Sequence, residues 1–399
     1  MFKGIIESFA LIIEACKREF KLIFADSAIV MSYIISVLLV GFFYSYVYSH
    51  ETFNDLPVAV VDKDHSSLSQ QVSRMIEATP QLTIAYHTSS LDMAKELYEK
   101  EEVKGIIVIP ADFGRDIQKG LMPHVSAYCD ASYMLYYKQT IGAVMQALGT
   151  FNGQVEVNKM LSSGIPMEQA VATRRPFNIT ATPLYNINVG YATFLIPVVF
   201  IIALQTLQLT GMGILGGTMR ELNQYSKTFA FANRRFGSVF LTLGRSLTYL
   251  IISMVLLLIE ICVVMHIFTF PQRGNLFEII VFLIPFILAV TFMGMALVNL
   301  FRRREDAIMT VTIFSIPTLL LSGISWPTVA FPTWAKIVSV FVPSTTGAQG
   351  FVALSQFGAS LSEMKSLLIQ MWAVCIFYFV LAVWTNSRFC KQEKKTDSI

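Results

Sequence analysis

Apolar residues in this chain gather into long stretches that carry few or no charges. Six of these stretches approach or exceed the roughly 20 apolar residues that one membrane crossing needs. They cover residues 27–49, 190–212, 246–267, 279–301, the stretch that begins at 307, and 366–387. The pattern therefore predicts an α-helical polytopic membrane protein with six spans.

The stretch 307–350 is longer than one crossing and carries no charge before Lys336. Prolines and a glycine interrupt it, and proline breaks or kinks a helix. We expect one span followed by a broken or re-entrant segment, marked by Gly323, Pro327, Pro332, Trp334 and Pro343. The alternative is a plain span followed by a surface loop.

The first 26 residues place apolar side chains at helical spacing with charged side chains between them. This pattern favours an amphipathic helix that lies in the membrane interface, directly before the first span at 27–49. A surface helix packed on a soluble partner is the alternative. Charges interrupt the apolar stripe, so no cleavable signal peptide is indicated.

Residues 50–188 have a different composition, in which short apolar runs alternate with amphipathic helical patterns. Strands are predicted at 56–61, 82–86, 103–109 and 125–129, and a long helix at 133–161. Alternating strands and helices indicate an inserted α/β domain with a largely parallel sheet.

Lysine and arginine are distributed unevenly between the two sets of short loops. One set holds most of them, including Arg220, Arg245 and Arg303, and the segment 388–399 is also basic. The positive-inside rule then places both termini in the cytoplasm and the α/β domain outside. Residues 189–387 form a transmembrane domain with five further spans.

The overall composition excludes several classes of protein. Of the 399 residues, 54% are hydrophobic and 14% are charged, which is typical of a membrane protein. The net charge of +3 does not indicate nucleic-acid binding. No metal site is predicted, because Asp62, Asp64 and His65 match no ligand motif and suit a turn. No catalytic set stands out, so we expect a protein that is not an enzyme.

Three motifs resemble those of the type-2 ABC transporter (ABC-2) permeases, in particular the drug-exporter-like branch with a large external domain. They are Leu-Ser-Gly-Ile-Ser-Trp-Pro at 321–327, Phe-Pro-Thr-Trp at 331–334, and Pro-Ser-Thr at 343–345. The opening of the α/β domain, Leu-Pro-Val-Ala-Val-Val-Asp at 56–62, is similar too. The cytoplasmic loop keeps only Arg220-Glu221 of the charged run that the family often carries.

This resemblance implies a permease subunit of an exporter for drug-like, lipid-like or other amphipathic substrates in a bacterial inner membrane. Such permeases pair with a second permease copy or homologue. A separate ATPase subunit carries the ATP and Mg, and often a periplasmic adaptor and an outer-membrane channel join. The chain has no phosphate-binding Gly-x-x-x-x-Gly-Lys-Ser/Thr loop of its own. Arg220 and Glu221 are the expected ATPase-coupling residues.

Glu260 lies inside the apolar stretch 246–267. Ionisable residues at membrane depth normally face a bundle interior or a cavity, because burial in lipid is costly. One hypothesis is that Glu260 lines the translocation path with Gln205 and Gln208. The other is that it makes structural hydrogen bonds between helices, with these glutamines as partners, or reaches the outer interface.

Two further functions remain open from sequence. One is a non-transporting membrane protein whose external domain binds a partner, such as a phage receptor or a secretion accessory. The other is a secondary transporter, although such folds usually show internal repeats, and none is found in this chain.

Overall fold

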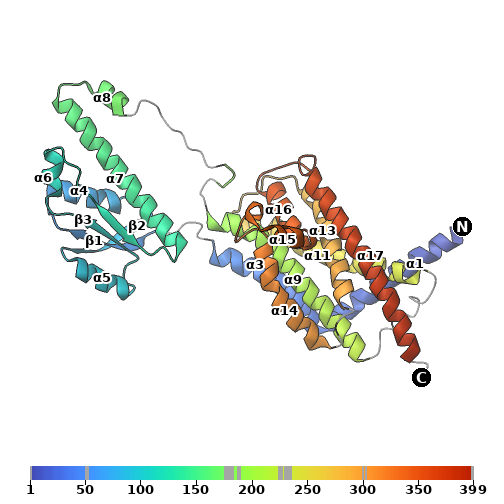
Figure 1. The fold of residues 1–399 in the computed structure, drawn as a ribbon. Helices are drawn as coiled ribbons and strands as arrows, with labels where there is room; N and C mark the ends of the chain where they lie inside the picture. The colour runs from blue at the N-terminus through green and yellow to red at the C-terminus, as the bar shows by residue number, and fades with distance from the viewer. Residues whose placement is uncertain are drawn as a thin grey trace. The chain divides into compact units, whose positions relative to one another are not determined.

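The computed structural model describes residues 2–49, 54–174, 184–186, 190–222, 228, 236–298, 301 and 303–396. The chain divides into two compact units. One unit contains Met1–Glu51 and Pro183–Ile399, and the other contains Thr52–Thr182. We call them the membrane unit and the α/β unit (Figure 1). The α/β unit is slightly shorter than the predicted 50–188.

The α/β unit contains a four-stranded sheet in the order β2-β1-β3-β4. The strands are β1 (Leu56–Asp62), β2 (Leu82–Thr88), β3 (Gly105–Ile109) and β4 (Ser126–Cys129). β1 pairs in parallel with β2 and β3, and β4 is antiparallel to β3. All four predicted strands are therefore present, in a largely parallel sheet.

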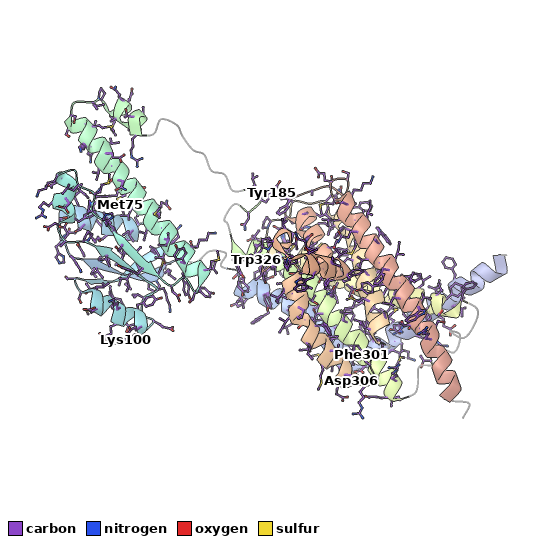
Figure 2. All side chains as sticks on the ribbon, in the orientation of Figure 1. Met75, Lys100, Tyr185, Phe301, Asp306 and Trp326 are labelled. Atoms are coloured by element: carbon purple, nitrogen blue, oxygen red, sulfur yellow. The ribbon has the colours of Figure 1, made fainter. Side chains whose placement is uncertain are left out.

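Both faces of this sheet are covered by helices. Val58 and Val60 pack on the face that carries α4 (Ser67–Glu77), α6 (Phe113–Gln118) and α7 (Met134–Ser162). Ala59 and Val61 alternate to the other face, beneath α5 (Leu91–Glu99). Figure 2 labels Met75 on the α4 side and Lys100 at the end of α5. The alternation follows from the two-residue period of a strand.

The membrane unit contains helices and connecting loops, and no strand, within its described residues (Figure 1). Its N-terminal part comprises α1 (Phe2–Ala25) and a first span built from α2 (Ser27–Ile29), η1 (Val30–Ile35) and α3 (Ser36–Val47). The later helices are α9 (Tyr191–Glu221), α11 (Gly237–Ile259), η3 (Glu260–Val264), α12 (Met265–Ile267), α13 (Leu276–Val298), α14 (Arg304–Leu321), η4 (Thr328–Ala330), α15 (Thr333–Phe341), α16 (Pro343–Ser355) and α17 (Lys365–Thr396).

Five of the described helices are long and apolar enough to cross a membrane, or six if one bent pair counts as a span. The five cover Ser27–Val47, Tyr191–Glu221, Gly237–Ile267, Leu276–Val298 and Lys365–Arg388. The protein is thus a multi-pass helical membrane protein. The predicted fifth span, α14, is not among them, because its 18 residues begin with three charged ones. α17 continues through most of the predicted tail.

Small residues let the helices of the membrane unit approach closely. A Cβ at Gly216 of α9 would overlap Val298 of α13, and a Cβ at Gly350 of α16 would overlap the ring of Phe282. α13 is the most buried of the candidate spans, with 78% of its apolar window inside the unit. The core of the unit is therefore built around α13.

The N-terminal helix α1 packs along α11. Ala15 and the backbone of Ile12 fill the space that Gly244 leaves open. The neighbouring stripe of α1 exposes Phe9, Ile13 and other apolar residues to the surroundings. One apolar face of α1 therefore packs on α11 within the same chain. The prediction of an interfacial helix did not include this contact.

Candidate functional site

The membrane unit contains a cavity of about 470 Å³ between α3, α9, α14 and the residues that follow α14. Most of its walls are apolar, from residues such as Val199, Ile202 and Leu319. The lining residues are Val40, Tyr44, Tyr48, Tyr191, Phe194, Leu195, Val199, Ile202, Ala203, Thr206, Leu207, Ser315, Ile316, Leu319, Ile324 and Ser325. Its volume suits a drug-sized molecule. We call it the membrane cavity.

Tyrosine side chains form one part of the lining of the membrane cavity. The rings of Tyr44 and Tyr48 stack with centroids 6.1 Å apart, and Tyr48 lies 5.5 Å from Tyr191. Thr206 and Ser315 add aliphatic hydroxyls. No lysine, arginine, aspartate or glutamate is among the lining residues. The cavity thus offers apolar surface and neutral hydrogen-bonding groups, which suit the uncharged part of an amphipathic molecule.

Gln205 and Gln208 are not among the residues that line this cavity. Gln205 accepts a hydrogen bond of 2.8 Å from the backbone N–H of Ser344 at the start of α16. Gln208 accepts from Ser253 Oγ at 2.9 Å and donates to Thr291 Oγ1 at 2.7 Å. Both glutamines therefore bind neighbouring helices together in this conformation.

The hydroxyl of Tyr33 extends this arrangement, because it hydrogen-bonds Ser253 Oγ. Tyr33, Ser253, Gln208 and Thr291 then form one continuous buried chain across four helical segments. Every member is satisfied, which favours a rigid and specific helix arrangement.

Glu260 is fully buried at the start of η3, and neither carboxyl oxygen has a hydrogen-bond partner among the described residues. The predicted pairing with Gln205 and Gln208 is therefore wrong for this conformation. The carboxyl group occupies the space beside Gly41 of α3, where a Cβ would overlap Oε1. Ser45, one turn along α3, also has an unpartnered buried hydroxyl. Glu260 does not line the membrane cavity.

The segment after α14 is bent, as the prolines and glycine indicated. α14 ends at Leu321, and Gly323 follows with a φ of +88°, which is readily adopted only by glycine. Pro332 precedes α15, and Pro343 begins α16; the two helices meet at 84°. Figure 2 labels Trp326 in the short turn before η4, after Gly323 and next to Pro327. Trp334 of α15 is 68% exposed, which suits an interfacial aromatic residue.

Arg220 and Glu221 lie together at the end of α9, where they hold the turn between α13 and α14. Arg220 donates a hydrogen bond to the carbonyl of Phe301. Glu221 accepts from the backbone N–H of Arg304 at 3.1 Å, and the Arg304 guanidinium lies 3.5 Å from Asp26. Figure 2 shows Phe301 and Asp306 at this same end of the unit. We expected a short helix within 219–232. α9 continues to Glu221, and most of the rest of that range lies outside the described residues.

One buried ion pair was not predicted. Glu19 of α1 and Arg245 of α11 are 0% and 2% exposed, and Nη2 of Arg245 lies 2.9 Å from Oε1 of Glu19. Tyr249 donates a second hydrogen bond to the same oxygen at 3.1 Å. Sequence reasoning assigned Arg245 only to membrane orientation. No local signal could have found the pair, because the predicted span began at Ser246, whereas α11 begins at Gly237 and places Arg245 inside the helix.

Within the described residues, no group of three or more histidine, cysteine, aspartate or glutamate side chains is placed to hold a metal ion. Asp62 and Asp64 instead stabilise the turn after β1. Asp62 accepts hydrogen bonds from two backbone N–H groups and from Ser69, and Asp64 accepts from the N–H of Gly114.

Comparison with known proteins decides the family. The family model described as "ABC-2 family transporter protein" matches residues 27–384, which include the first four candidate spans and most of the fifth, Lys365–Arg388. The chain belongs to the ABC-2 transporter family. This ABC-2 permease is also 23% identical over 371 residues to the linearmycin resistance permease protein LnrN of Bacillus subtilis strain 168, covering 89% of this chain and 94% of that protein. The chain is therefore a transporter permease, as its motifs indicated.

Proposed function

We propose that this ABC-2 permease is the membrane subunit of an exporter that moves an amphipathic, drug-like or lipid-like substrate out across a bacterial inner membrane. The membrane cavity carries this proposal. It has the volume of a drug-sized site, apolar walls and hydroxyl groups without ionised side chains. The similar permease is named for linearmycin resistance, and we propose a resistance-type export for this chain too.

The proposed orientation puts both termini and the end of α9 in the cytoplasm and the α/β unit outside. The basic residues of the short loops support it, since positive charge is retained on the cytoplasmic side. A cysteine at position 224 should react with impermeant reagents only from the cytoplasm, and one at Glu99 only from outside. Reversed labelling would overturn the direction of transport as well as the topology.

Energy is proposed to come from a separate ATPase that binds ATP and Mg, with a second permease copy or homologue completing the transporter. A periplasmic adaptor and an outer-membrane channel are further proposed partners. The proposed coupling site is the end of α9, where Arg220 and Glu221 hold the turn before α14. Because α14 lines the membrane cavity, a movement of this turn would shift α14 and change the shape of the cavity that holds the substrate.

Charge reversal tests this coupling. Exchanging the two residues, Arg220→Glu with Glu221→Arg, should reduce ATP-driven transport while the permease still assembles with its ATPase. Unchanged transport would remove both residues from the coupling role.

Glu260, Gln205 and Gln208 retain a proposed place in the path only for a conformation in which the helices separate, since they are buried between helices here. Glu260→Gln preserves the shape and removes the charge. If export is lost while assembly is normal, the charge acts in transport. If Glu260→Gln transports normally and Glu260→Leu is unstable, the role is structural.

A resistance assay tests the function itself. Cells that express the permease with its ATPase should tolerate amphipathic antibiotics better than cells without it. Ala203→Trp fills the membrane cavity and should abolish this tolerance. Val380→Trp on α17 adds the same side chain at a position that is 61% exposed and away from the cavity, and should have no effect. Equal tolerance for both variants would contradict the assignment.

A further inference from the structure

The α/β unit has a cavity of its own, with a volume of about 520 Å³. Its lining residues come from α6, the segment 120–125 and α7, on the face of the sheet that also carries α4. All of its lining residues belong to the α/β unit, so it is separate from the membrane cavity. Its volume falls within the range of small-molecule sites.

The inner wall of this cavity is apolar. Phe113 and Phe151 stack with centroids 5.9 Å apart and are 3% and 2% exposed. Leu148 and Val155 of α7 continue the wall. At the rim, Met122 is 90% exposed. The cavity therefore has a buried aromatic base. At its entrance, the apolar side chain of Met122 is exposed to water, which solvates it poorly.

Three polar side chains lie along α7, on successive turns: Asn152, Glu156 and Lys159. His124 of the segment 120–125 is the fourth polar residue of the lining. Glu156 already pairs with Arg174, whose Nε lies 3.0 Å from its carboxylate. No carboxylate of the described residues lies within 4.0 Å of the Lys159 ammonium group.

The ammonium group of Lys159 lies close to the backbone of the segment 120–125. It lies near Gly120, where a Cβ would be 3.4 Å from Nζ. Gly120 has a φ of +75°, so a side chain there would also strain the backbone. The rim therefore keeps an unpaired positive charge above an apolar interior.

We propose that this cavity binds a single-chain anionic amphiphile, with the apolar tail against Phe113 and Phe151 and a carboxylate on Lys159. The apolar interior matches the tail, and the charge at the rim matches the head group and disfavours an amine. This is a binding site outside the membrane unit, and it does not depend on the substrate proposed for the membrane cavity.

Photo-crosslinking to the full-length permease in lipid nanodiscs tests the proposal. The probes are palmitate and hexadecylamine that carry the same diazirine on the chain. Mass spectrometry should find palmitate attached within 113–125 and 148–159, at least ten times more than the amine. Labelling confined to membrane-unit peptides, or equal labelling by the two probes, would overturn the proposal.

Variants complete the test. Lys159→Glu should lower palmitate labelling of these peptides about tenfold. Lys138→Glu reverses an exposed lysine on the same helix, outside the cavity, and should leave labelling unchanged. Asn152 is exposed, so Asn152→Trp should block the cavity without disturbing the core of the α/β unit, and it should abolish labelling. Labelling that survives both Lys159→Glu and Asn152→Trp would contradict the site.

Discussion

Removal of the buried carboxylate of Glu19 should release α1 from α11. Glu19→Gln leaves the Arg245 guanidinium buried without a charge partner, with Tyr249 bound to a neutral amide instead. Loss of one partner of a buried ion pair costs about 3–5 kcal/mol. Each 1.4 kcal/mol changes an equilibrium constant about tenfold. If the ion pair acts mainly by holding α1 on α11, the population with α1 released should rise about 140- to 4,000-fold.

Cys16 reports this release locally. It lies on α1 where Thr248 of α11 donates hydrogen bonds to its carbonyl and thiol, at 3.0 and 3.3 Å. In a variant that keeps only this cysteine, the rate of thiol alkylation measures how often α1 leaves α11. Glu19→Gln should raise that rate by two to three orders of magnitude.

Two controls separate the ion pair from general charge effects. Glu14 pairs with Arg18 on the same helix, but both side chains are more than 40% exposed, so Glu14→Gln should cost under about 1 kcal/mol. The double variant Glu19→Leu with Arg245→Met removes both charges and should regain much of the loss. Alkylation of Cys16 that is equally slow in wild type and Glu19→Gln would refute the reasoning.

Three further changes have expected outcomes. Gly350→Ala should lower the thermal stability of the membrane unit by about 1–3 kcal/mol, because the new methyl group overlaps the Phe282 ring; an unchanged melting temperature would contradict this packing. Glu221→Ala removes the acceptor for the Arg304 N–H and should speed hydrogen exchange there, while exchange at mid-helix amides of α13 serves as the reference. Burial alone would raise the pKa of Asp62, but hydrogen bonds from the backbone and from a serine outweigh this effect, so the net result is a lowered pKa. Asp62→Asn should therefore destabilise the α/β unit at neutral pH. The difference in stability between wild type and Asp62→Asn should vanish as the pH falls through the pKa of Asp62 in the folded protein.

Periodicity and motif predicted most of the architecture. The four strands, the long helix α7 and the bent segment at Pro343 all follow from local rules, since alternation, helical spacing and proline act over a few residues. The fifth span is the exception. α14 begins three residues before the apolar stretch, with Arg304, Glu305 and Asp306, and ends at Leu321, so its apolar part is shorter than one crossing. Helix boundaries are the part of such a pattern that is hardest to predict.

The contacts between helices could not be predicted. Glu19 and Arg245 are 226 residues apart in sequence, and nothing local distinguishes a buried pair from two interfacial charges. The membrane cavity was missed for the same reason. Its tyrosines and serines are ordinary interfacial residues in sequence, and only the packing of α3, α9 and α14 brings them together. Glu260 stood out as unusual, but its position beside Gly41 required the tertiary structure.

ATP-driven transport through the membrane cavity is the central proposal, and reconstitution tests it most directly. The permease and its ATPase would be placed in proteoliposomes, with uptake of a fluorescent amphipathic drug into inside-out vesicles as the measurement. We expect uptake that requires ATP, is lost in Ala203→Trp and is retained in Val380→Trp. ATP-dependent uptake that is equal in both variants would show that the substrate takes another route.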